Sequence, residues 1–109
     1  MNWLHDLSYL FGGAFFVNAL PHFVSGVMGR PFQTPFASPP GQGLSSSSVN
    51  VLWGVVNFAI AWLLIVCVGH FDIRLTDQAL SVGLGGLLMG LFSARTFGRF
   101  HGGNSPLRH

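Results

Sequence analysis

Lysine and glutamate are absent from the 109 residues, and cysteine occurs once. Only 7% of the residues are charged, whereas an ordinary soluble domain carries about 25%. So few charged side chains cannot cover a water-soluble globule of this length, and lipid must solvate much of the exterior. The composition therefore indicates an all-α membrane protein, and the length allows a single transmembrane domain over residues 1–109.

The same absences argue against several function classes. A net charge of +2 provides no basic surface for nucleic acid, and a single cysteine, Cys67, builds neither a disulfide nor a thiolate metal site within one chain. The histidines apart from His22 lie at or beyond the ends of the apolar runs, which disfavours a metal site. Serines occur without a glutamate and without an acidic residue inside an apolar run. We therefore expect no enzyme, no metal and no cofactor.

Three apolar runs are long enough to cross a bilayer, which takes about 20 helical residues. We expect spans at about residues 7–28, 49–68 and 79–97, with the second and third as antiparallel neighbours in a compact bundle. A Pro/Ser/Gly-rich loop over residues 30–48 separates the first two spans, and we expect it to lie on the membrane surface or to fold back over the bundle. Ser47 or Ser48 is expected to cap the second span. Residues 100–109 are expected to form a mobile tail.

Polar residues interrupt the first span near its middle. Asn18 and His22 are four residues apart and share a helical face, and Pro21 predicts a kink or break between turns. Polar and ionisable residues within a membrane are rare, which makes Asn18, His22 and Asn57 candidate ligand or pathway residues. The alternative is structural: a neutral His22 would bond Asn57 or a freed carbonyl and hold helices together.

Small residues recur at helical spacing in the second and third spans. Asn50, Gly54, Asn57 and Ala61 form one stripe, and Gly86, Gly90 and Ala94 form another. Small residues at this spacing allow helices to approach closely in lipid. We expect both stripes to be helix-packing surfaces and the second to be wide enough to recruit a partner helix, so that bulk at Gly86 or Gly90 would break an assembly.

The arginines predict the orientation. Arg30, Arg95, Arg99 and Arg108 fall on one side of a three-span chain and Arg74 on the other, and basic residues favour the cytoplasm. We therefore expect the N-terminus outside and the C-terminus in the cytoplasm. Arg95 and Arg99 are expected to anchor the third span at the lipid interface, where they could also meet anionic headgroups.

Several segments together resemble a group of small, uncharacterised bacterial inner-membrane proteins. They are Asn18-Ala19-Leu20-Pro21-His22-Phe23 with Gly26 and Gly29, the Thr34-Pro35-Phe36 loop, and Asn50-Val51-Leu52-Trp53-Gly54. The resemblance implies a bacterial inner membrane and no activity.

Two function classes follow from these patterns, with a third behind them. The first is a non-enzymatic small membrane protein whose partners are the lipid bilayer and either copies of itself or the subunits of a larger complex. The alternative is a small transporter or channel with a polar site at mid-membrane. A haem or pigment binder that uses His22 is the weakest of the three, because no second histidine lies at its depth.

Overall fold

The computed structural model describes residues 1–105 as three long helices and one short hairpin. The helices are α1 (Trp3–Val27), α2 (Ser47–Val66) and α3 (Thr76–His101), and the two-residue strands β1 (Phe32–Gln33) and β2 (Leu44–Ser45) pair antiparallel. All three helices are long and apolar enough to cross a membrane, which makes this a multi-pass membrane protein by length and composition.

The helix ends differ from the predicted ones by a few residues. Asn2 caps α1, because its side-chain oxygen accepts from the backbone N–H groups of Leu4 and His5. Ser46 caps α2 by accepting from Val49 N at 3.2 Å, one residue before the predicted cap. α3 continues to His101 and ends at Gly102, whose φ of 83° favours glycine. The predicted tail therefore begins inside a helix, and residues 106–109 of that tail lie outside the described residues.

Pro21 does not divide the first span. α1 is one continuous α-helix of 25 residues that includes Pro21, so of the predicted kink or break the break does not occur and the kink stays a prediction. A proline removes one backbone donor, and a membrane helix tolerates this where neighbouring groups surround it.

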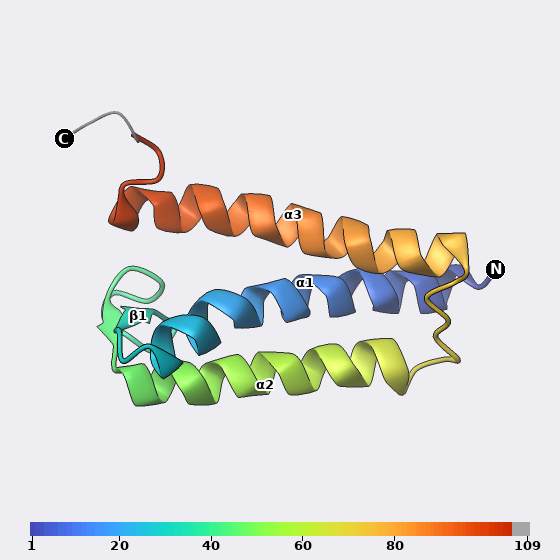
Figure 1. Cartoon of the computed structure of the whole chain (residues 1–109), viewed down its shortest axis with the longest axis horizontal. Coiled ribbons are helices and arrows are strands. Elements are labelled where there is room, and N and C mark those ends of the chain that lie inside the picture. The colour runs from blue at the N-terminus through green and yellow to red at the C-terminus, as the bar shows by residue number, and fades with distance from the viewer. Residues whose placement is uncertain (106–109) are drawn as a thin grey trace.

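α1 lies between α2 and α3 (Figure 1). It packs along both neighbours, antiparallel to α2 and parallel to α3, while α2 and α3 make almost no contact with each other. α2 and α3 run antiparallel, as predicted for the second and third spans, but the prediction that they are neighbours is wrong. The connector between α2 and α3 reverses the direction of the chain. It is long enough to pass the end of α1, so α3 lies on the other side of α1 from α2.

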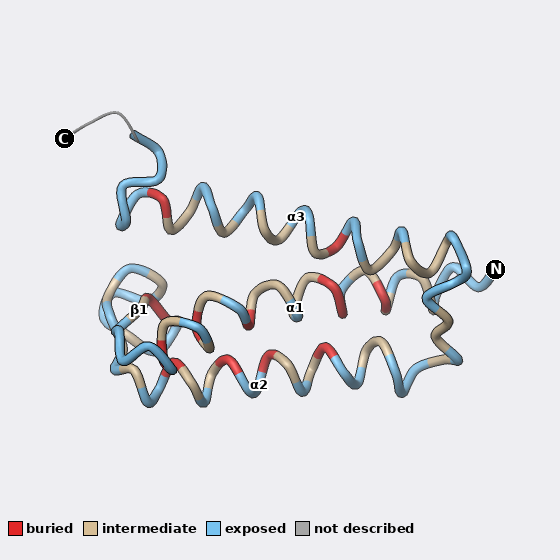
Figure 2. The backbone as a smooth tube through the Cα atoms, in the orientation of Figure 1, coloured by how far each residue is buried: buried red, intermediate tan, exposed pale blue. Residues whose placement is uncertain are grey.

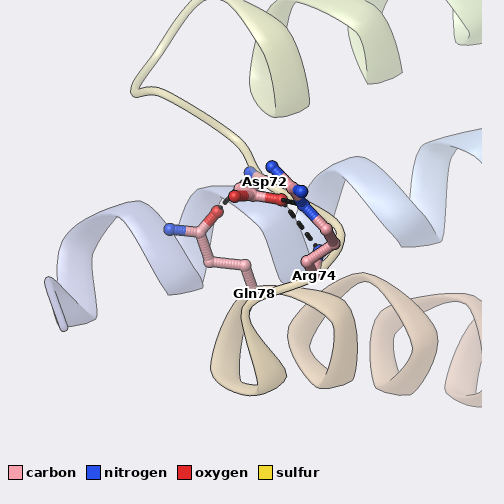
Figure 3. A network of polar contacts seen from close by, with 3 residues as sticks. All are labelled: Asp72, Arg74 and Gln78. Carbon is pink, nitrogen blue, oxygen red and sulfur yellow. Dashed lines mark hydrogen bonds and ion pairs between the residues drawn. The ribbon is translucent and has the colours of Figure 1, made fainter.

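The connector is held by local polar contacts (Figure 3). The backbone N–H of Asp72 donates to Oε1 of Gln78 at 2.7 Å, and Oδ1 of Asp72 accepts from the Arg74 N–H at 2.9 Å. The exposed Arg74 side chain also pairs with Asp72 at 3.4 Å. An exposed pair of this kind contributes little to stability, and its role is to shape the turn.

Close helix approach explains where the small residues lie. The buried residues of α2 are the four of the predicted stripe: Asn50, Gly54, Asn57 and Ala61. They face α1, where a Cβ on Gly54 would lie 2.8 Å from the backbone N of Phe23. Figure 2 shows the buried residues of α2 on the side that faces α1.

α3 approaches α1 closely at a different pair of glycines. A Cβ on Gly85 would overlap the carbonyl oxygen of Leu10, and one on Gly13 would overlap that of Val82. Gly86 and Gly90 face Val17 of α1, and Ala94 is exposed beside them. The predicted Gly86–Gly90 stripe is thus used largely within the chain. The closest contact, at Gly85, was not in the predicted set.

Candidate functional site: a polar cavity under the loop

A cavity of about 250 Å³ lies where the three helices meet the loop between α1 and α2. We call it the His22 cavity. Asn18 and His22 of α1, Trp53 of α2, three residues of α3 and four residues of the loop line it. Its lining residues are Asn18, His22, Gln33, Thr34, Pro35, Gly41, Trp53, Phe92, Thr96 and Phe97.

Asn50 holds His22 in place from the first turn of α2. Nδ1 of His22 lies 2.9 Å from Oδ1 of Asn50, and both residues are buried. The sequence predicted Asn57 or a freed carbonyl as the partner of His22. That prediction is wrong, because Asn50 lies two helical turns earlier on the same face of α2 and reaches His22 first.

The network around Asn50 determines which of its amide atoms faces His22. Nδ2 of Asn50 lies 3.0–3.2 Å from three carbonyl oxygens, those of Phe32, Ser45 and Ser46. Only an N–H donor is stable among three acceptors, so Oδ1 must be the atom that meets His22. The amide also fastens both strands of the hairpin to α2.

The tautomer of His22 follows from this geometry. Oδ1 of Asn50 only accepts, so Nδ1 of His22 carries the proton and donates. None of the residues that line the cavity is a carboxylate, and a charged imidazolium there would lack a counter-ion. His22 is therefore neutral, and its Nε2 is an acceptor. Within residues 1–105 the His22 ring makes its hydrogen bond through Nδ1, which leaves Nε2 free to accept.

Asn18 is fixed in a similar way. Its Nδ2 donates to Oδ1 of Asn57 at 2.9 Å, and Nδ2 of Asn57 donates to the Trp53 carbonyl at 2.8 Å. The second bond orients the Asn57 amide, and the first then orients Asn18. In the described part of the chain the Asn18 side chain makes its hydrogen bond through Nδ2, which leaves Oδ1 as a further acceptor.

The three candidate pathway residues do not share one environment. Asn18 and His22 line the cavity, whereas Asn57 is 0% exposed and does not line it. Asn57 acts here as the residue that positions Asn18. Asn50 positions His22 in the same way. The sequence could have indicated this role, because Asn50 lies on the same stripe of α2 as Asn57.

The loop over the cavity is tied down at several points. The hydroxyls of Thr34 and Ser45 hydrogen-bond each other, and Thr34 is 1% exposed. At the end of α3, Nε2 of His101 lies 2.8 Å from Oε1 of Gln33, and its ring stacks on Phe32 with the centroids 4.9 Å apart. Sequence reasoning treated His101 as a solvated tail residue. Its role was not visible there, because its partners lie 68 and 69 residues away.

Aromatic rings surround the imidazole of His22. Phe32, Phe97 and Trp53 meet it edge to face, with centroid distances of 5.5, 6.1 and 6.4 Å. This geometry suits the quadrupoles of the rings and keeps water away from much of the imidazole. The polar atoms of the cavity therefore lie in a largely apolar setting.

A second cavity, of about 520 Å³, lies between α1 and α3. Predominantly apolar residues line it, including Val17, Leu20, Gly90, Ala94 and Phe97, together with His101. Of the two predicted anchors, Arg99 extends over the ring of Phe100 at 5.0 Å and Arg95 is exposed. Neither arginine lines either cavity.

A smaller polar cluster lies near the N-terminal ends of α1 and α3. The carboxyl of Asp6 lies beside that of Asp77, and the hydroxyl of Tyr9 is buried without a hydrogen-bond partner in the described residues.

Among residues 1–105, no group of three histidine, cysteine or acidic residues comes together in a way that could hold a metal ion. At about 250 Å³ the His22 cavity falls below the roughly 300–1,000 Å³ of pockets for drug-sized ligands.

The chain was compared with protein-family models, with curated proteins and with solved structures, and none of them matches it.

Proposed function

We propose that this protein is a small non-enzymatic integral membrane protein that acts as a homo-oligomer, with α3 as the interface between copies. One observation carries the proposal. Of the 26 residues of α3, only Gly85 and Gly98 are buried within the chain, and half of the helix is exposed, including its leucines. An accessory role in a larger complex uses the same surface and is an outcome of the test below.

The outward face of α3 carries a ladder of leucines. Leu80, Leu84, Leu87 and Leu91 follow one another at spacings of four, three and four, and they are 48–65% exposed. This is the spacing at which two helices interlock side chains along a shared seam. In lipid the gain comes from packing rather than from water exclusion, so regular spacing matters more than apolarity.

The test compares two leucine pairs. Leu84→Ala with Leu87→Ala shortens the ladder, while Leu52→Ala with Leu63→Ala removes the same atoms from the outward face of α2. We expect cross-linked dimers or higher species in native membranes, lost in the α3 variant and retained in the α2 variant. A monomer in both the native and mild-detergent states contradicts self-association, and a foreign subunit retained through the ladder indicates an accessory role.

Bulk at Gly86 or Gly90 is not a clean test of assembly. Both glycines face Val17 of α1, so larger side chains there disturb packing inside one chain. The leucine ladder avoids this problem because its side chains point away from α1.

The alternative is a small transporter or channel, and the His22 cavity favours it. Asn18 and His22 present acceptor atoms to the cavity. Asn57 is fully buried, bonds Asn18 and does not line the cavity. This alternative predicts that His22→Ala abolishes flux in proteoliposomes while helix content and thermal unfolding stay close to native. Native protein that passes none of the common monovalent ions or small neutral solutes contradicts it.

We further propose a bacterial inner-membrane location with the N-terminus outside. The single native cysteine tests the orientation, because Cys67 is exposed at the end of α2 that lies on the same side as the N-terminus. A membrane-impermeant maleimide should label intact cells with their outer membrane permeabilised. Labelling only in inverted vesicles contradicts the proposed orientation.

A further inference from the structure

The His22 cavity presents two hydrogen-bond acceptors that the protein itself leaves unused. Nε2 of His22 is fixed as an acceptor through Asn50, and Oδ1 of Asn18 is fixed through Asn57. Both side chains line the same space and lie one helical turn apart on α1. Unmade hydrogen bonds are costly in an apolar environment, so these atoms favour an occupant that donates.

The occupant should carry no charge. None of the lining residues is acidic, so a cation would be buried without a counter-ion. None is lysine or arginine, so an anion would lack one as well. A hydroxyl is a neutral donor with one O–H, so it satisfies one of the two acceptors without either penalty.

The walls indicate the shape of the occupant. Trp53, Phe92 and Phe97 supply aromatic surface on two sides of the cavity, from α2 and from α3. Planar rings pack well against such walls, edge to face or offset. A cavity of about 150 Å³ is enough to hold benzene, so the roughly 250 Å³ here has room for a substituted ring.

We propose that the His22 cavity binds a small uncharged phenol, whose ring packs between Trp53 and the phenylalanines of α3 and whose hydroxyl donates to Nε2 of His22. The binding is non-covalent. It is independent of self-association, because the leucine ladder and the cavity lie on different faces of α3.

The test uses para-cresol and its methyl ether, 4-methylanisole, with the full chain in lipid nanodiscs. The two probes have similar shape and both enter lipid, but only the phenol has a hydroxyl donor. The readout is the ¹⁵N resonance of His22 Nε2 in histidine-labelled protein. Para-cresol should shift this resonance in a saturable way and bind about tenfold more tightly than the ether, the difference expected from one net hydrogen bond.

Two variants assign the signal. His22→Phe keeps an aromatic ring but removes the acceptor, and it should abolish the saturable response. His70→Phe makes the same change at an exposed histidine and should leave the response intact. If His22→Phe does not fold, the comparison of para-cresol with 4-methylanisole on the native chain still tests whether the hydroxyl donates to the cavity.

Two results would overturn the proposal. One is an unchanged Nε2 resonance at saturating para-cresol, which would mean that water or nothing occupies the cavity. The other is an equal response to the phenol and the ether, which would mean that both simply partition into lipid near the protein.

Discussion

Nδ1 of His22 donates to Oδ1 of Asn50 across 2.9 Å, and this bond connects the C-terminal part of α1 to the first turn of α2. The same Asn50 amide donates to carbonyls of both hairpin strands, so one buried side chain joins α1, α2 and the loop. Several expected outcomes depend on this connection.

Asn50→Ala should destabilise the protein more than any other single amide deletion in α2. It leaves Nδ1 of His22 without its partner and removes the bonds from the amide to the carbonyls of Phe32 and Ser45, and each unsatisfied buried group costs about 1–3 kcal/mol. Thermal unfolding in mild detergent measures the loss. Ser48→Ala, an exposed change in the same turn, is the control and should be neutral. Equal stability of the two variants would contradict the network.

Asn18 and Asn57 should be coupled in a double-mutant cycle. Replacing each with leucine, singly and together, isolates the bond between Nδ2 of Asn18 and Oδ1 of Asn57. We expect a coupling free energy of about 0.6–1.7 kcal/mol, the range measured for such bonds between membrane helices. A coupling indistinguishable from zero would show that the two amides do not stabilise each other.

Gly85→Ala should weaken the packing of α3 on α1. The added Cβ overlaps the Leu10 carbonyl, and an overpacked contact costs about 1–3 kcal/mol. Gly83→Ala is the matched control, because a Cβ at Gly83 meets nothing within 4 Å. Disulfide trapping between cysteines placed in α1 and α3 reports the packing. The idea fails if both variants trap as efficiently as the parent.

His101→Phe should loosen the loop while keeping the stacking on Phe32. The change removes the hydrogen bond to Gln33, with a net contribution of about 0.5–1.5 kcal/mol. Backbone amide exchange of residues 32–36 should become faster, while exchange in α2 stays unchanged. His70→Phe should alter neither, and protection of the loop equal to that of the parent would argue against the tie.

The sequence was informative wherever the signal was local. The three spans and the stripe through Asn50, Gly54, Asn57 and Ala61 are periodic patterns, and α2 buries those four residues. Predictions that needed long-range pairing were less successful. The pairing of His22 with Asn50, the tie between His101 and Gln33, and the position of α1 between the other helices all depend on contacts far apart along the chain.

The arrangement of the helices also makes the His22 cavity conditional. Phe92, Thr96 and Phe97 belong to α3, which packs on α1 and contacts the loop through His101, so the cavity is complete only when α3 is docked. By linkage, any occupant must strengthen that docking in proportion to its concentration relative to its dissociation constant. Chains divided within the 67–75 connector and expressed as two fragments would therefore reassemble more tightly when the cavity is filled.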